Sequence, residues 1–197
     1  MPAADTRPQQ LVLASGSARR RDLLRQIGIE PSLIDPPHID EHHGPRELPL
    51  AYAERMARGK LAAIAPKHTG CWILAADTVV ACGRRILPKA ETEAEARACL
   101  ALLSGRRHRV LGGIAIGAPG GRSAHRVVTT TVAFKRLTPG EIDAYVATGE
   151  WHGKAGGYAI QGHAAAFIPW INGSYGNVVG LSLSDTIAML RGLGWQG

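Results

Sequence analysis

The residues best suited to chemistry lie where an apolar segment gives way to a basic one. Residues 11–14 are apolar and run directly into Ser15-Gly16-Ser17, which Arg19-Arg20-Arg21 soon follows. Hydroxyls, guanidinium groups and the free N–H groups of a first helical turn all donate hydrogen bonds to an oxyanion. The pattern predicts an anion-binding corner with a phosphate ester as its ligand. An alternative is that Ser17 caps a surface helix whose arginines face water, and this segment alone leaves both interpretations open.

A second candidate is the carboxylate of Asp77. Residues 71–76 form a near-continuous apolar run, typical of a strand buried on both faces, and we expect this strand to end at Asp77-Thr78. Because a charge beside a buried strand is costly to desolvate, it more often belongs to a site than to a turn. An aspartate that caps a turn is the alternative.

Lysine is scarce in this chain, and three of its few lysines stand at suggestive places. Lys60 interrupts the apolar stripe of a helix predicted over residues 49–65, where a lysine often extends its ammonium to the surface. A predicted hairpin delivers Lys89 beside the end of the strand that precedes Asp77. Lys154 opens a glycine-rich segment that runs to residue 162, and such a segment favours close approach of the backbone to a ligand.

The composition bounds the kind of protein. With 197 residues, of which 45% are hydrophobic, the chain can form one buried globular domain, and we expect a single domain over residues 1–197. The net charge of +7 is compatible with nucleic-acid binding. However, the basic residues are scattered and aromatic residues make up only 5%, so a small polyanionic substrate is favoured over a polymer.

Targeting and cross-linking signals are weak. No apolar run approaches the roughly 18 residues that span a bilayer, and the N-terminus lacks the apolar core of a signal peptide. The three cysteines have no C-x-x-C spacing, which argues against a disulfide framework or a structural zinc site. We therefore expect a cytoplasmic protein that does not bind membranes.

The elements that must position these residues alternate between strands and helices in the first half and form hairpins in the middle. Two capping boxes, Thr92 to Glu95 and Thr138 to Glu141, predict helix starts. Further strands are expected over residues 11–14, 32–34, 109–116 and 125–134, and further helices over residues 18–27, 49–65 and 184–191. This order predicts an α/β or α+β fold with a mixed sheet.

Several standard motifs are absent. The chain has no Walker loop around Lys154, no G-x-G-x-x-G after a strand and no G-x-S-x-G nucleophile elbow. Residues 38–43 are rich in histidine and carboxylates, but they lie in a proline-rich loop without helical H-x-x-x-H spacing, and we expect solvated charges there. Oxyanion binders with isolated carboxylates remain, a set suited to phosphoryl chemistry.

Spaced blocks along nearly the whole chain, from Leu11 to about Leu190, resemble the Maf family of nucleoside triphosphate pyrophosphatases. In order, the blocks begin with Ser15-Gly16-Ser17-Ala18-Arg19-Arg20, Ala76-Asp77-Thr78 and Leu103-Ser104-Gly105. They continue with residues 154–162, Ile171-Asn172-Gly173-Ser174-Tyr175 and Gly180-Leu181. Each block is modest by itself, and their order makes the resemblance strong.

The resemblance implies a fold, a reaction and a cofactor. The implied fold is like that of inosine-triphosphate pyrophosphatases, with two lobes around a central cleft on an elongated mixed sheet with flanking helices, assembled as a homodimer. The implied reaction cleaves the α–β phosphate bond of a nucleoside triphosphate, giving a nucleoside monophosphate and pyrophosphate. The implied cofactor is a divalent metal cation, Mg²⁺ or Mn²⁺.

The resemblance also implies roles for individual residues. Asp77 would be the general base or a metal carboxylate, and Glu41 a second metal carboxylate. With the corner hydroxyl of Ser17 included, the expected triphosphate-binding residues are Ser15, Ser17, Arg19, Lys60, Lys89 and Lys154. Arg20, Thr78 and Gln161 match the branch of the family that prefers dTTP and UTP, and a glutamine amide suits the edge of a uracil-type base.

The chain departs from the family pattern beside the expected nucleobase end, where Trp151-His152-Gly153 precedes Lys154. Two alternatives to an enzyme come from the charge and from the family's name. One is a basic nucleic-acid-binding protein, and the other is a septum-associated regulatory protein that keeps the fold without turnover.

Overall fold

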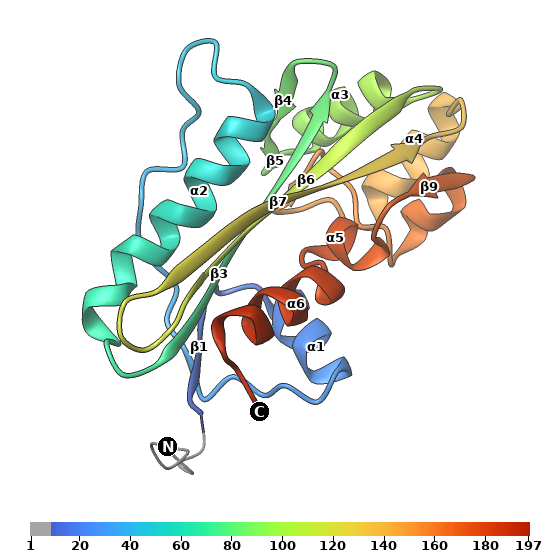
Figure 1. Cartoon of the computed structure of the whole chain (residues 1–197). Coiled ribbons are helices and arrows are strands. Elements are labelled where there is room, and N and C mark those ends of the chain that lie inside the picture. The colour runs from blue at the N-terminus through green and yellow to red at the C-terminus, as the bar shows by residue number, and fades with distance from the viewer. Residues whose placement is uncertain (1–8) are drawn as a thin grey trace.

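A long mixed sheet is the frame of the fold (Figure 1). The computed structural model describes residues 9–197, so residues 1–8 of the predicted domain lie outside the described residues. The strand order is β2-β1-β3-β6-β7-β9, with β4 paired to β3. Strand β1 runs parallel to β2 and β3, and the other pairs are antiparallel. The bounds are β1 Leu11–Ala14, β2 Leu33–Ile34, β3 Trp72–Cys82, β4 Arg85–Leu87, β6 Arg107–Gly117, β7 Ser123–Ala133 and β9 Trp170–Asn172.

Helices flank this sheet, and a short two-stranded ribbon stands apart from it. The ribbon pairs β5 (Lys89–Ala90) with β8 (Lys154–Ala155). The helices are α1 Ala18–Gln26, α2 Pro49–Ile64, α3 Glu93–Leu103, α4 Pro139–Ala147, α5 Tyr175–Val179 and α6 Leu183–Leu193, with 3₁₀ turns η1 Ala65–Lys67 and η2 His163–Phe167. The predicted mixed α/β sheet with flanking helices is confirmed. Among residues 9–197 no helix combines the length and the apolar character that a membrane crossing requires.

Alternation along β3 explains why its first half is apolar throughout. Ile73 and Ala75 pack with Ala57 and Ile64 of α2 on one face of the sheet. The residues between them, such as Leu74, pack on the other face in a core that includes residues of α1 and α6. A strand covered on both faces needs apolar side chains at every position.

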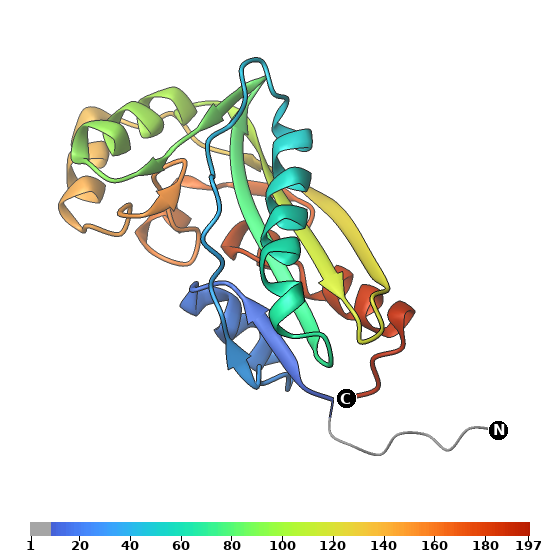
Figure 2. The same cartoon turned by 90° about the vertical axis from the view of Figure 1, so that its left-hand side faces the viewer.

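A second large core lies toward the other end of the same strands. It joins Val80 and Val110 to Leu100 of α3 and Tyr145 of α4. Figure 2 shows α3 and α4 gathered at one end of the sheet and α1 with β1 and β2 at the other. Strands β3 and β6 contribute side chains to both cores, so the same two strands connect the two ends of the molecule.

The predicted end of the strand at Asp77-Thr78 is wrong. Strand β3 continues to Cys82, and it pairs with β6 without interruption from Ile73 to Ala81. Lys60 forms an ion pair with the Asp77 carboxylate, as described below. The negative charge is therefore compensated inside the strand, and β3 can continue past it. Both predicted capping boxes are confirmed, at the starts of α3 and α4.

Candidate active site

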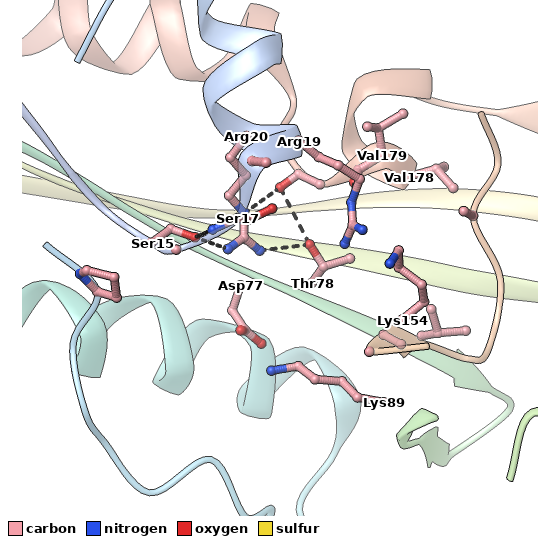
Figure 3. A pocket seen from close by; sticks show the side chains of 18 of the residues that line it. Ser15, Ser17, Arg19, Arg20, Asp77, Thr78, Lys89, Lys154, Val178 and Val179 are labelled. Atoms are coloured by element: carbon pink, nitrogen blue, oxygen red, sulfur yellow. Dashed lines mark hydrogen bonds between the residues drawn. The ribbon is translucent and has the colours of Figure 1, made fainter. Parts of the chain in front are cut away.

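A pocket of about 390 Å³ opens between the corner after β1, the middle of β3 and the ribbon (Figure 3). Every residue predicted for the site from the sequence lines it: Ser15, Ser17, Arg19, Arg20, Glu41, Lys60, Asp77, Thr78, Lys89, Lys154 and Gln161. The fold therefore brings together residues that are up to 146 positions apart in the chain, from Ser15 to Gln161. Their chemical roles stay predictions.

The corner after β1 is built around Arg20, which is only 8% exposed. Its Nε donates to the Gly180 carbonyl at 3.0 Å, its Nη1 to Ser15 Oγ at 2.7 Å and its Nη2 to Thr78 Oγ1 at 3.1 Å. Ser17 stands at the N-cap position of α1, but its side chain makes no capping hydrogen bond. For Arg20 the alternative of an arginine that faces water is therefore wrong. Its side chain connects three segments of the chain through hydrogen bonds to Ser15, Thr78 and Gly180.

The buried side chain of Arg20 stays positively charged. Burial lowers the pKa of Arg20, while the nearby carboxylate of Asp77 works in the opposite direction. An arginine starts from a pKa far above neutral, so it stays protonated at physiological pH. Arg20 therefore adds a fixed positive charge beside Asp77.

Two further cations share the open part of the pocket. Arg19 donates from Nε to the Val179 carbonyl at 3.2 Å, and Figure 3 shows its guanidinium group and the Lys154 amine directed toward the same space. The pKa of Lys154 is lowered, first by burial and then by the positive charge of Arg19. Because two like charges that face one space repel each other, an anion placed between them would relieve this repulsion.

A chain of alternating charges runs through the pocket from Asp77. Lys60 is 7% exposed, and its Nζ lies 2.6 Å from Asp77 Oδ1 and 2.7 Å from Glu41 Oε1. The Nζ of Lys89 lies 2.5 Å from Glu41 Oε2. Lys60 therefore does not extend to the surface, which was the alternative that the sequence offered. Burial raises the pKa of Glu41, but hydrogen bonds from Lys60 and Lys89 outweigh it and hold that pKa at about 2.

The donor set of this chain fits a hard divalent cation that arrives with a phosphate ligand. Within residues 9–197 no group of three or more His, Cys, Asp and Glu side chains is arranged to hold a metal ion. The carboxylates of Asp77 and Glu41 nevertheless converge from β3 and from the loop before α2 on one cation, the Lys60 ammonium. Because Mg²⁺ commonly uses one or two protein carboxylates together with substrate phosphate oxygens, the pair is a suitable partial ligand set.

The ribbon positions the remaining lysines. Lys89 pairs with Ala155, and Ala90 pairs with Lys154, so both amines are carried by adjacent strands. Gly156 follows with φ of 70°, and a Cβ at that position would lie 2.8 Å from Val80 Cγ1 of β3. Only glycine permits this close approach with a positive φ, which explains why a glycine occupies position 156.

Some pocket residues were not assigned from the sequence. Tyr158 lies inside the glycine-rich segment, and that position is the signal that could have marked it as part of the wall. Val178 and Val179 reach the pocket from α5, whereas Pro36 comes from the long loop after β2. For these three residues no local pattern in the sequence indicates a ligand.

The fold and the pocket define a mixed α/β protein whose cationic cavity contains paired carboxylates. The family described as "Maf-like protein" matches residues 10–193, and the chain belongs to that family. It is 62% identical over 185 residues to a dTTP/UTP pyrophosphatase of Paramagnetospirillum magneticum, covering 94% of this chain and 97% of that protein. It is 58% identical over 196 residues to a dTTP/UTP pyrophosphatase of Rhodospirillum rubrum, covering 99% of this chain and 93% of that protein.

One solved structure shows a more distant likeness. The nucleoside-triphosphatase / dITP/XTP pyrophosphatase from Mycobacterium abscessus has a TM-score of 0.44 and 15% identity to this chain. The comparison covers 94% of this chain and 98% of that one.

Proposed function

We propose that this chain is a nucleoside triphosphate pyrophosphatase that hydrolyses dTTP and UTP to the nucleoside monophosphate and pyrophosphate. The observation that carries the proposal is that one pocket is lined by three lysines, Lys60, Lys89 and Lys154, and by the carboxylates of Asp77 and Glu41, which contact Lys60 and Lys89. Relatives more than half identical to this chain bear the name of that activity. A triphosphate carries the negative charge that such a set of cations can neutralise.

The chemical step needs a water, a base and stabilised leaving oxygens. The oxygen of water bonds to phosphorus, the P–O bond of the α–β anhydride breaks, and the proton of water passes to a carboxylate. Asp77 is the residue proposed to accept or orient that proton, since it lies in the middle of strand β3 beside Lys60. Ser15, Ser17, Arg19 and the three lysines are proposed to bind the triphosphate oxygens.

A divalent cation, Mg²⁺ or Mn²⁺, completes the proposal. Glu41 and Asp77 would hold it together with phosphate oxygens, and the cation would neutralise charge on the triphosphate. The proposed base-selecting residues are Arg20, Thr78 and Gln161. Gln161 is exposed at the pocket, whereas Arg20 gives hydrogen bonds to protein acceptors and would act by fixing the shape of the cavity.

The proposal extends to the domain organisation, oligomeric state, location and partners of the protein. We propose a single domain over residues 1–197 that works as a cytoplasmic homodimer, without a nucleic-acid polymer or a membrane as its partner. The rival interpretations, a nucleic-acid-binding protein and a septum-associated protein without turnover, both predict that no nucleotide is hydrolysed.

The deciding assay measures pyrophosphate release from dTTP, UTP, CTP, GTP, ATP and methylated GTP, with and without Mg²⁺ or Mn²⁺. The proposal predicts metal-dependent release that is fastest with dTTP and UTP. Release that is fastest with methylated GTP would contradict the base preference. No release from any nucleotide, combined with tight and steeply salt-dependent binding to DNA or RNA, would support the nucleic-acid interpretation instead.

A further inference from the structure

The loop that carries Glu41 has little backbone support of its own. It connects β2 to α2, and within residues 9–197 no backbone-to-backbone hydrogen bond involves residues 36–43. Glu41 nevertheless has a defined place, because its carboxylate contacts both Lys60 and Lys89. Side-chain contacts must therefore fix the path of this loop.

Two side chains of α2 hold consecutive carbonyl groups of the loop. Tyr52 donates from its hydroxyl to the Glu41 carbonyl at 2.5 Å. Arg55 donates from Nη2 to the next carbonyl, that of His42, at 2.9 Å. Residues three apart on a helix lie on the same face, so Tyr52 and Arg55 contact the loop side by side.

Neighbouring contacts restrain these two side chains. The guanidinium carbon of Arg55 lies 5.4 Å from the centre of the Tyr52 ring. Arg55 also donates to both carboxylate oxygens of Glu47, at 2.7 Å each, and the ring of His43 meets the Tyr52 ring edge-on. Such a bidentate pair fixes the orientation of an arginine as well as its charge.

Helix α2 therefore holds Glu41 at two points. Tyr52 holds its main chain, and Lys60, two turns later on the same helix, holds its carboxylate at 2.7 Å. We propose that Tyr52 and Arg55 are positioning residues that hold the Glu41 loop on α2, so that the Glu41 carboxylate meets Lys60 beside Asp77. This role rests on the proposed pyrophosphatase function, and it assigns Tyr52 and Arg55 no contact with the substrate.

The first test removes a single hydroxyl with Tyr52→Phe. Loss of a hydrogen bond that orients a metal-binding residue typically costs about 10- to 100-fold in metal affinity or activity. We expect the Mn²⁺ concentration for half-maximal binding, followed by electron paramagnetic resonance with a non-hydrolysable dTTP analogue, to rise about tenfold. The value of kcat/KM for dTTP should fall by a similar factor. Tyr175→Phe is the matched control, because Tyr175 is 48% exposed and no hydrogen bond of its hydroxyl is found within residues 9–197.

A double-mutant cycle separates positioning from general damage to the fold. If Tyr52 acts through Glu41, Tyr52→Phe will cost nothing further in a protein that already carries Glu41→Gln. Arg55→Lys should reproduce the effect on Mn²⁺ binding, and Arg58→Lys is its control, because the exposed Arg58 pairs with Glu54 of its own helix. This second pair of variants keeps the inference testable if Tyr52→Phe does not fold.

Two results would overturn the inference. One is an equal loss from Tyr52→Phe with and without Glu41→Gln, and the other is unchanged Mn²⁺ binding in both Tyr52→Phe and Arg55→Lys. Absence of turnover in the unmodified protein would instead reject the proposed function. The Mn²⁺ titration with the nucleotide analogue would still decide the positioning role in that case.

Discussion

Both walls of the pocket carry cations, but the cations of the two walls differ in burial. The first, which we call the buried wall, is formed by Ser15, Arg20, Lys60, Asp77 and Thr78. The second, the ribbon wall, is formed by Lys89, Lys154 and Gln161. Arg20, Lys60 and Asp77 are 8%, 7% and 5% exposed, whereas Lys89 and Gln161 are exposed and Lys154 is half-buried.

The two walls differ in how firmly the protein holds their charged side chains before a ligand binds. Each charged side chain of the buried wall is held by protein partners before any ligand arrives. Its reorganisation during a reaction therefore costs little free energy. In the ribbon wall, Lys89 contacts Glu41 and Lys154 donates to the His152 carbonyl, but these two side chains are more accessible to solvent and to a ligand. Substitutions in the buried wall should therefore reduce both stability and activity, whereas those in the ribbon wall should reduce activity alone.

The largest expected effect follows from Asp77→Asn. Removal of a positioned base typically lowers kcat by about 10²- to 10⁴-fold, and an amide of the same size leaves room for the nucleotide. We expect pyrophosphate release to be nearly abolished while dTTP binding, measured by calorimetry, is largely kept. Asp143→Asn, which breaks a surface pair with Arg97, is the control. Unchanged turnover in Asp77→Asn would remove Asp77 from the mechanism.

The next effect concerns a buried histidine that supports the ribbon side of the pocket. His108 is 2% exposed, its Nε2 lies 2.8 Å from the hydroxyl of Tyr158, and burial lowers its pKa to about 4. Since the unfolded chain takes up this proton near pH 6.5, protonation favours unfolding. The free energy of unfolding therefore keeps the full contribution of His108 above pH 6.5. It falls by roughly 3 kcal/mol as the pH drops from 6.5 to about 4.

Urea unfolding between pH 4 and pH 7.5 measures this dependence. His108→Phe should flatten the curve in that window, because the buried imidazole is then absent from both states. The same slope in the variant and in the unmodified protein would show that other groups cause the acid sensitivity.

Arg20→Lys tests the buried wall directly. A lysine cannot reach the three acceptors of Arg20 at once, and loss of a hydrogen bond to a charged group costs about 2 kcal/mol. For a chain of this size the melting temperature should fall by roughly 4–8 °C. Arg25→Lys in the same helix, where Arg25 pairs with Glu30 at the surface, should change it little. Equal melting temperatures for the two variants would refute the claim that the buried wall is built in advance.

Lys154→Met tests the ribbon wall and should have a smaller effect than the substitutions above. Its Nζ donates only to the His152 carbonyl among the described residues, so the free energy of unfolding should change by less than about 0.5 kcal/mol. The KM for dTTP should rise about tenfold, because one charged contact to the triphosphate is lost. Lys135→Met, at a surface pair with Glu141, serves as the control. A fall in melting temperature without a change in KM would assign Lys154 to the fold.

Local signals in the sequence predicted much of the fold. The capping boxes at Thr92 and Thr138 marked the starts of α3 and α4, because capping depends on residues only three apart. The extent of β3 was not predictable in this way. Its continuation past Asp77 depends on pairing with β6 and on Lys60, a partner from another element.

The candidate site shows the same division. The residue types indicated an anion site, and the fold brings those residues into one pocket. The division into two walls was not predictable, because burial of Arg20 depends on the Gly180 carbonyl, 160 positions along the chain. Likewise, nothing in the sequence near Glu41 indicates that Tyr52 holds its carbonyl.

The proposed cleavage of dTTP can be followed by ³¹P nuclear magnetic resonance during incubation with the unmodified protein and Mg²⁺. Cleavage of the α–β bond in the pocket between the two walls predicts equal amounts of dTMP and pyrophosphate as the first products. Asp77→Asn should leave dTTP intact over the same period. Formation of dTDP and inorganic phosphate, or intact dTTP with the unmodified protein, would contradict the account.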